Sequence, residues 1–237
     1  MPKRPCAVTI TPDSRTIILG DKFGDVYAIP LLPTPEEDEA AAKALQNATK
    51  PFVPTATTLT VHSGANRRAL EAQLKQAKEN PPVKKKEALA FAHDLLLGHV
   101  SMLTDVVVAE LGPEFGYKKP RRYILTSDRD EHIRISRGPP QSYVIEGFCL
   151  GHHEFVSKLC LAKSDLLVSG GGDDQMLVWD WRNNTIKCRI EVKRAIQEFW
   201  QTQENTLQGQ NSQDELCVAV SGIWLFRAPK NDDVSKP

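Results

Sequence analysis

Short runs of apolar residues separated by polar turns dominate the chain. Three such runs open it, and they span Ala7–Ile10, Thr16–Leu19 and Val26–Ile29. Turn-forming residues separate them, first Thr-Pro-Asp-Ser at 11–14 and then Phe-Gly-Asp at 23–25. This pattern predicts β-strands joined by tight turns.

The same rhythm returns in the second half of the chain. The strands predicted there are Asp105–Val108, Tyr123–Thr126, Ile133–Ile135, Val156–Leu161, Leu166–Ser169, Met176–Trp181 and Thr185–Val192. Two more are expected within 215–229, on either side of Ser221-Gly222. Many short strands with polar turns predict an all-β fold.

Two segments break this rhythm. Residues 33–92 are acidic, then Ala-rich, then rich in helix formers, with a run of three lysines at 84–86. Such a segment buries little apolar surface, so we expect a disordered or partly helical insertion. The lysine run is either a solvated part of it or an element for nuclear import or RNA contact. Residues 193–214 are polar and are expected to form a linker.

A repeat links the strands. Gly98-His99 recurs as Gly151-His152, and the second pair is followed by an apolar strand, Leu-Val-Ser-Gly, an Asp turn and Trp179-Asp180. This order resembles a WD repeat, whose four-stranded blades stack radially into a β-propeller. In the WD family a hydrogen-bonded chain ties the strands of one blade. The residues that match it here are His152, Ser169, Asp173 and Trp179.

The repeat that begins at Gly98 matches less completely. Aligning residues 125–136 with 168–179 places Thr126 on Ser169, Asp130 on Asp173 and Ser136 on Trp179. We therefore expect His99, Thr126 and Asp130 to form the structural chain of this blade without a tryptophan.

The predicted fold is a WD-repeat β-propeller with three recognisable blades and a partial fourth. The predicted segments are a blade at 1–32, the insertion at 33–92, two consecutive WD-type blades at 93–192, the linker at 193–214, a partial blade at 215–230 and a tail at 231–237. Seven blades of about 40–45 residues need more than about 280 residues. We therefore expect an incomplete ring, from a fragment or a truncated gene model.

Composition narrows the range of possible functions and cellular compartments. The chain of 237 residues has 30 basic and 30 acidic residues, so bulk charge excludes a strongly polyanion-seeking protein. The five cysteines are scattered without a Cys-x-x-Cys pair, which is typical of reduced thiols in a nuclear or cytosolic protein. No apolar run is long enough to span a bilayer, and the first residues show no signal-peptide core.

Three chemical interpretations fail on sequence context. His152, Ser169 and Asp173 are the residue types of a hydrolase triad, but no Gly-x-Ser-x-Gly motif surrounds Ser169. The glycines at 170–172 are followed by no Lys-Ser/Thr, as a phosphate-binding loop would require. The two histidines at 152–153 with Cys149 and Cys160 match no common zinc spacing. We expect no catalytic, cofactor or metal site in this chain.

Two charged segments are candidate contact surfaces. Asp128, Arg129, Asp130 and Glu131 stand in a predicted turn, and charges there are exposed or matched by a partner because burying them unpaired is costly. Arg134 is expected to point outward and brace Glu131 or Asp130. A second set lies in the loop before residue 123 and could contact RNA phosphates: Lys118, Lys119, Arg121 and Arg122. The alternative in both cases is a solvated surface.

Five blocks of sequence together resemble one family, the non-catalytic WD-repeat subunit of the tRNA (guanine-N7-)-methyltransferase, in a fungal version. They are DKFGDVYAI (21–29), LLGHVSMLTDV (96–106), ILTSDRDEHIRIS (124–136), CLGHHEFVSKLC (149–160) and LLVSGGGDDQMLVWDW (166–181). The resemblance implies an accessory subunit that does no chemistry. It implies a heterodimer in which the chain stabilises a catalytic subunit that holds S-adenosylmethionine and forms 7-methylguanosine in the tRNA variable loop.

The resemblance also implies a location and a set of contacts. The protein is expected in the nucleus, with the cytoplasm as a second site, and tRNA is expected to be reached mainly through the partner. The partner-binding residues are expected to be the turn Asp128–Glu131 braced by Arg134, then Lys22, Phe23 and Asp25, and then His153 and Glu154. The alternative function is a WD-repeat scaffold in an unrelated complex.

Overall fold

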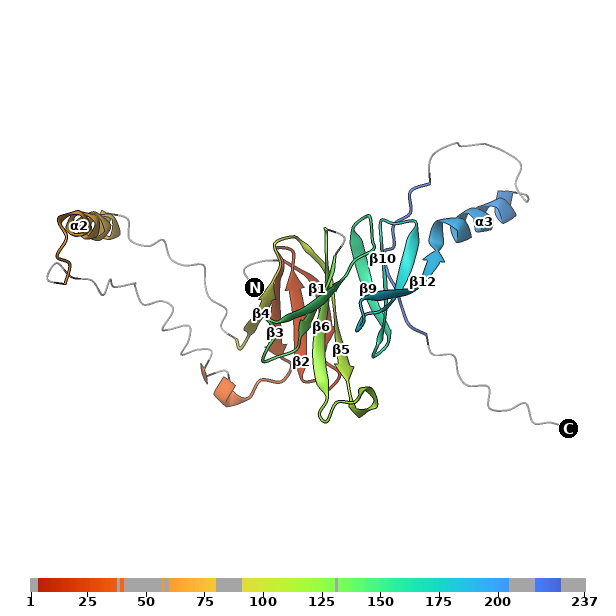
Figure 1. Ribbon diagram of the computed structural model, residues 1–237, viewed down its shortest axis with the longest axis horizontal. Helices are drawn as coiled ribbons and strands as arrows, with labels where there is room; N and C mark the ends of the chain where they lie inside the picture. The colour runs from red at the N-terminus through yellow and green to blue at the C-terminus, as the bar shows by residue number, and fades with distance from the viewer. Residues whose placement is uncertain are drawn as a thin grey trace. The chain divides into compact units, whose positions relative to one another are not determined.

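The computed structural model describes residues 4–37, 39–40, 57, 60–79, 91–130, 132–204 and 216–226. Contacts divide the chain into two units, one made of Leu32–His93 with Met1–Pro2 and one made of Lys3–Leu31 with Asp94–Pro237. In the described part of the first unit the main element is helix α2 (Gly64–Glu79). All the strands among the described residues belong to the second unit (Figure 1).

The strands form three antiparallel four-stranded sheets, and in each sheet neighbours in sequence are neighbours in space. The first sheet contains β1 (Pro5–Ile10), β2 (Thr16–Asp21), β3 (Asp25–Pro30) and β4 (Asp94–Gly98). The second contains β5 (Leu103–Leu111), β6 (Arg121–Asp128), β7 (Ile133–Arg137) and β8 (Ile145–Cys149). The third contains β9 (Val156–Lys163), β10 (Leu166–Gly171), β11 (Gln175–Asp180) and β12 (Thr185–Glu191). This is the blade arrangement that the repeat predicts.

The first sheet is completed by a strand that lies beyond the insertion. β4 pairs with β3, with Val26 opposite Leu97 and Ala28 opposite Asp94. The repeat pattern instead predicts that residues 93–192 form the next two blades. The difference arises because the Gly-His pair marks the end of an outer strand, so the repeat unit is offset by one strand from the sheet.

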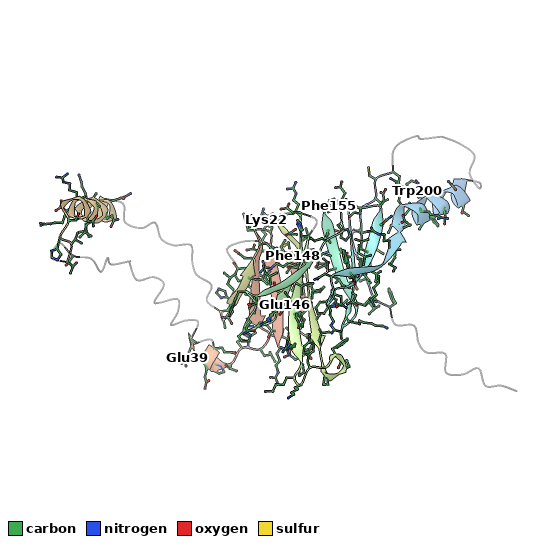
Figure 2. The ribbon with its side chains drawn as sticks, viewed as in Figure 1. Lys22, Glu39, Glu146, Phe148, Phe155 and Trp200 are labelled. Atoms are coloured by element: carbon green, nitrogen blue, oxygen red, sulfur yellow. The ribbon has the colours of Figure 1, made fainter. Side chains whose placement is uncertain are left out.

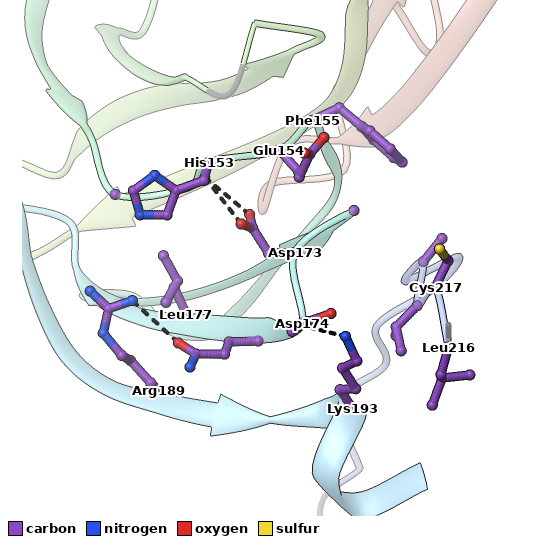
Figure 3. A pocket seen from close by; sticks show the side chains of 15 residues that line it. His153, Glu154, Phe155, Asp173, Asp174, Leu177, Arg189, Lys193, Leu216 and Cys217 are labelled. Carbon is purple, nitrogen blue, oxygen red and sulfur yellow. Dashed lines mark hydrogen bonds and ion pairs between the residues drawn. The ribbon is translucent and has the colours of Figure 1, made fainter. Parts of the chain in front are cut away.

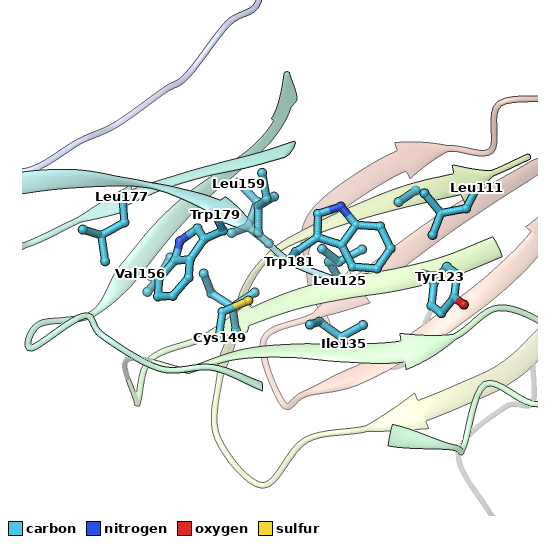
Figure 4. Close-up of a cluster of buried hydrophobic side chains, with 13 residues drawn as sticks. Leu111, Tyr123, Leu125, Ile135, Cys149, Val156, Leu159, Leu177, Trp179 and Trp181 are labelled. Carbon is cyan, nitrogen blue, oxygen red and sulfur yellow. The ribbon is translucent and has the colours of Figure 1, made fainter. Parts of the chain in front are cut away.

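Two apolar clusters hold adjacent sheets together. Leu103, Val106 and Ile124 of the second sheet pack against buried residues of the first sheet such as Ile18. The second cluster joins the second and third sheets and contains Trp179 and Trp181 (Figure 4). The rings of Trp181 and Tyr123 lie 5.2 Å apart between centroids. Burial of these aromatic side chains stabilises the contact between the second and third sheets.

A repeated side-chain hydrogen bond connects each inner strand to the segment that follows it in the next blade. Cys6 Sγ donates to the Leu103 carbonyl (3.1 Å), Thr104 Oγ1 to the Val156 carbonyl (2.5 Å) and Ser157 Oγ to the Val220 carbonyl. Val220 therefore occupies the place that Val156 has one blade earlier. No strand is assigned within residues 216–226, although the sequence predicted strands there; the Val220 N–H donates to the Gly171 carbonyl instead.

Helix α3 (Val192–Glu204) replaces the start of the predicted polar linker. Its apolar residues Val192, Ile196, Phe199 and Trp200 recur at helical spacing, a stripe that the surrounding polar residues concealed. Within the described residues, no helix has the length and apolar character needed to cross a membrane.

Candidate functional site

Most of the residues predicted to contact a partner lie on one rim of the sheets. This upper rim is made of the connections β2–β3, β4–β5, β6–β7, β8–β9 and β10–β11, and Lys22 and Phe155 mark it at the top of Figure 2. The predicted partner-binding residues that lie on this rim are Lys22, Phe23, Asp25, Asp128, Arg129, Asp130, His153 and Glu154. Glu131 lies outside the described residues. The β5–β6 connection lies at the opposite end of the strands, which we call the lower rim.

The β6–β7 turn is held by a carboxylate beneath it. Asp128 is only 9% exposed, and its Oδ2 accepts a hydrogen bond from His99 Nδ1 (3.3 Å) while its Oδ1 accepts the Asp130 N–H (3.0 Å). Burial raises the pKa of Asp128, but these hydrogen bonds and the nearby histidine charges hold it below its ordinary value overall. The Arg129 N–H donates to the Met102 carbonyl. The turn therefore presents Arg129 and Asp130 outward on a fixed frame.

The alignment of Asp130 with Asp173 was wrong about which carboxylate binds the histidine. In the middle blade Asp128 contacts His99, whereas Asp130 lies at the exposed tip of the turn. In the last blade Gly171 stands at the position of Asp128. A Cβ at Gly171 would lie 1.7 Å from the Phe155 carbonyl oxygen, so no side chain fits there. The acid of the last blade consequently comes from the later position, Asp173.

Arg134 braces the rim from below rather than from beside the turn. Its Nε donates to Ser136 Oγ (3.0 Å) and its Nη1 to the Gly98 carbonyl (2.9 Å). Burial lowers the pKa of Arg134, and the negative charge of Asp128 opposes that shift. The predicted outward brace to Asp130 is therefore replaced by a half-buried guanidinium that ties β7 to the end of β4. The small Ser136, where the last blade has Trp179, accepts one of its hydrogen bonds.

The predicted hydrogen-bonded chain is present in the last blade. Because a carboxylate only accepts hydrogen bonds, His152 Nδ1 donates to Asp173 Oδ2 (2.6 Å). His152 Nε2 bonds Ser169 Oγ (2.6 Å), which also accepts the indole N–H of Trp179 (2.8 Å). Burial lowers the pKa of His152, while Asp173 acts in the opposite direction. Ser169 is fully buried with its hydroxyl engaged, so this constellation ties strands together and reaches no substrate.

The upper rim also presents apolar side chains that the sequence pattern did not predict. Exposed apolar residues stand in its connections: Val100, Met102, Leu150 and Phe155. Phe23 is 54% exposed, with Lys22 Nζ 5.4 Å from its ring centroid. Apolar residues directly beside the two Gly-His pairs were a signal that could have found them, because such connections are otherwise polar. Apolar and charged side chains together are typical of a protein-binding surface.

A groove opens at the end of this rim. It has a volume of about 780 Å³ and lies between the β8–β9 connection, the β10–β11 turn, the start of α3 and residues 216–219 (Figure 3). Lys193 Nζ pairs with Asp174 Oδ2 at 3.0 Å, and the His153 N–H donates to Asp173. Among the described residues, no group of three or more His, Cys, Asp or Glu side chains is placed to hold a metal ion.

The predicted RNA-contact residues lie on the lower rim, in the β5–β6 connection or directly after it. Arg122 is engaged by two carboxylates, since its Nε pairs with Glu110 Oε2 (2.9 Å) and its Nη2 with Asp13 Oδ2 (2.7 Å). Lys118, Lys119 and Arg121 are exposed. Arg122 is therefore held by ion pairs, whereas the other three predicted residues are exposed to solvent.

The matching family model and the related sequences agree on one family. The model of the tRNA methyltransferase TRM82 WD40 domain matches residues 1–236. The tRNA (guanine-N(7)-)-methyltransferase non-catalytic subunit TRM82 of Phaeosphaeria nodorum is 53% identical over 94% of this chain and 46% of its own length. The corresponding subunit of Sclerotinia sclerotiorum is 48% identical over 99% of this chain and 43% of its own length. The chain therefore spans less than half the length of these relatives.

A more distant relative and a solved structure were also found. The TRM82 subunit of Debaryomyces hansenii is 35% identical over 98% of this chain and 40% of its own length. A crystal structure of RRP9 WD40 repeats aligns with a TM-score of 0.42 and 18% identity, covering 78% of this chain and 38% of that one.

Proposed function

Because this chain belongs to the family of the tRNA methyltransferase TRM82 WD40 domain, we propose that it acts in the non-catalytic subunit of a tRNA (guanine-N(7)-)-methyltransferase. Its role there is to bind the catalytic subunit and stabilise it in its active form. The observation that carries this proposal is the family match along almost the whole chain. The relatives bear the same subunit name, and the match includes every strand of the three blades.

The upper rim supplies the docking surface in this proposal. Asp130 and Glu154 present exposed carboxylates to basic groups of the partner, and Phe23, Met102 and Phe155 supply apolar area to be buried. Complementary charges favour correct orientation and fast association, while buried aromatic side chains supply most of the affinity.

The frame under the rim makes this surface rigid before binding. His99 holds Asp128, Asp128 holds the turn, and Arg134 ties the neighbouring strand to Gly98. A rim that is already ordered loses less conformational entropy on docking, which favours affinity. Residues of the frame should therefore affect binding without touching the partner.

The stabilising effect on the catalytic subunit follows from the coupling of binding to folding. A subunit that binds only the folded form of the catalytic subunit stabilises it by mass action, by about 2.7 kcal/mol when present at 100 times its Kd. In this scheme S-adenosylmethionine is held by the catalytic subunit and the WD-repeat chain contributes no reacting group.

A methyl-transfer assay tests the proposal. The catalytic subunit of the same organism is incubated with S-adenosylmethionine and unmodified tRNA, with and without this chain. We expect the chain alone to be inactive, and its addition to raise the yield of 7-methylguanosine and lengthen the half-life of the catalytic activity. An unchanged yield and half-life, with the chain shown to be folded by circular dichroism, would refute the proposal.

A further inference from the structure

The lower rim carries a loop that is folded into a fixed shape. The β5–β6 connection contains a short 3-10 helix, Pro113–Phe115, and ends it at Gly116, whose φ of 84° lies in the left-handed region. Phe115 and Tyr117 pack against the core cluster between the second and third sheets. The loop is therefore anchored by its aromatic residues while its basic residues face outward.

Two guanidinium groups from neighbouring blades stack on these rings. Arg121 lies 4.6 Å from the Tyr117 ring centroid. Arg182, from the β11–β12 turn, lies 4.9 Å from the Phe115 ring centroid. A stacked guanidinium directs its N–H groups outward from its edge, where they can donate to phosphate oxygens. One side-chain hydrogen bond of Arg121 is made with Tyr123.

The neighbouring carboxylates are already engaged. Glu110 and Asp13 both pair with Arg122, and the hydrogen bonds from Thr11 and Arg122 lower the pKa of Asp13 to about 2. Glu146 pairs with Arg137, and the Glu114 carboxylate accepts the Gly112 N–H.

Four basic side chains lie on this loop and on the adjacent β11–β12 turn. In the described part of the chain, none of the ion pairs includes Lys118, Lys119, Arg121 or Arg182. These four side chains therefore form a local group of positive charges, although the whole chain is neutral.

We propose that Lys118, Lys119, Arg121 and Arg182 form a binding surface for the phosphate backbone of RNA. The choice of RNA among polyanions rests on the proposed function. A membrane surface fits less well, because the segment 112–122 has no large apolar residue among the exposed ones and membrane-binding loops insert such residues. The surface lies at the opposite end of β6 from the proposed docking turn, so RNA and the catalytic subunit would occupy different rims.

Salt dependence gives the expected signature. Each phosphate that a protein neutralises contributes a slope of about −0.7 to −0.9 to the plot of log affinity against log salt concentration. Four contacts predict a slope of about −3, and loss of two lysines should reduce its magnitude by about 1.5.

The test is filter binding of an unmodified tRNA transcript to the full chain without the catalytic subunit. We compare Lys118→Ala/Lys119→Ala with Arg67→Ala/Arg68→Ala, which removes an equal charge from an exposed adjacent pair on α2. The first variant should bind RNA at least about tenfold more weakly at 0.1 M salt, with the reduced slope, and the second should bind like the wild type.

In the RNA-binding assay, two outcomes would overturn the proposal: no RNA binding by the wild-type chain, or equal loss in both variants. Capture of the catalytic subunit is measured on the same proteins. The Lys118→Ala/Lys119→Ala variant should capture it normally, so failure of RNA binding and failure of docking are read separately. Normal RNA binding with lost capture would assign the loop to a protein partner and overturn the proposal as well.

Discussion

Replacing Trp179 by alanine should destabilise the last blade more than any exposed substitution. The indole is 0% exposed, its N–H donates to Ser169, and its ring contacts the region of Gly151. Truncating a fully buried tryptophan leaves a cavity and costs about 3–5 kcal/mol. For a chain of 150–250 residues each kcal/mol shifts the Tm by about 2–4 °C, so the Tm should fall by about 6–20 °C.

A milder substitution separates the two contributions. Trp179→Phe keeps most of the apolar volume but removes the indole donor to the buried Ser169 hydroxyl, which should cost about 1–2 kcal/mol. Trp200→Ala on α3 is the matched control, because this indole is 52% exposed. All variants are compared by thermal unfolding followed by circular dichroism. A Tm for Trp179→Ala that equals that of Trp200→Ala would refute the assignment of Trp179 to the blade core.

Three further predictions concern side chains whose hydrogen bonds connect strands or neighbouring blades. Because the pKa of His152 is lower in the folded state, the unfolded state binds a proton more readily. The contribution of neutral His152 to stability is therefore present above a pH of about 6.5 and is lost as the pH falls toward the folded-state pKa. Denaturation midpoints between pH 7.5 and 5 should fall more steeply for the wild type than for His152→Gln. Arg134→Met removes hydrogen bonds to Ser136 and the Gly98 carbonyl and should cost about 1.5–3 kcal/mol in denaturant unfolding, with no loss contradicting the brace. Thr104→Val removes the hydroxyl link to the next blade and should cost about 1 kcal/mol, and an unchanged midpoint would show that the link is not stabilising.

The sequence predicted the three inner strands of each blade and the outer strand β12, because their apolar alternation and turn residues are local signals, but it did not predict the outer strands β4 and β8. The hydrogen-bonded chain of the last blade was also accessible, since the Gly-His pair, Ser169, Asp173 and Trp179 stand in family order. The pairing of β4 with β3 was not, because it joins segments separated by more than sixty residues of insertion. Long-range pairing is fixed by tertiary packing, which no local pattern encodes.

The wrong prediction that Asp130, and not Asp128, binds His99 in the middle blade has a different cause. Turn length aligned Asp130 with Asp173, yet the choice between Asp128 and Asp130 depends on the space above β6. At Gly171 the backbone of Phe155 fills that space, while in the middle blade a carboxylate fits. The position of Arg134 likewise depends on the room that Ser136 leaves. Such steric facts follow from packing and are absent from spacing alone.

The most direct test of the proposed docking function is the affinity of the catalytic subunit for this chain, measured by isothermal titration calorimetry. The comparison is between the wild type, Asp130→Lys on the upper rim and Asp165→Lys in the β9–β10 turn on the lower rim. We predict that the wild type binds, that Asp130→Lys binds at least about tenfold more weakly, a loss of about 1.4 kcal/mol or more, and that Asp165→Lys binds like the wild type. No binding by the folded wild-type chain, or an equal loss in the two variants, would contradict docking through the upper rim.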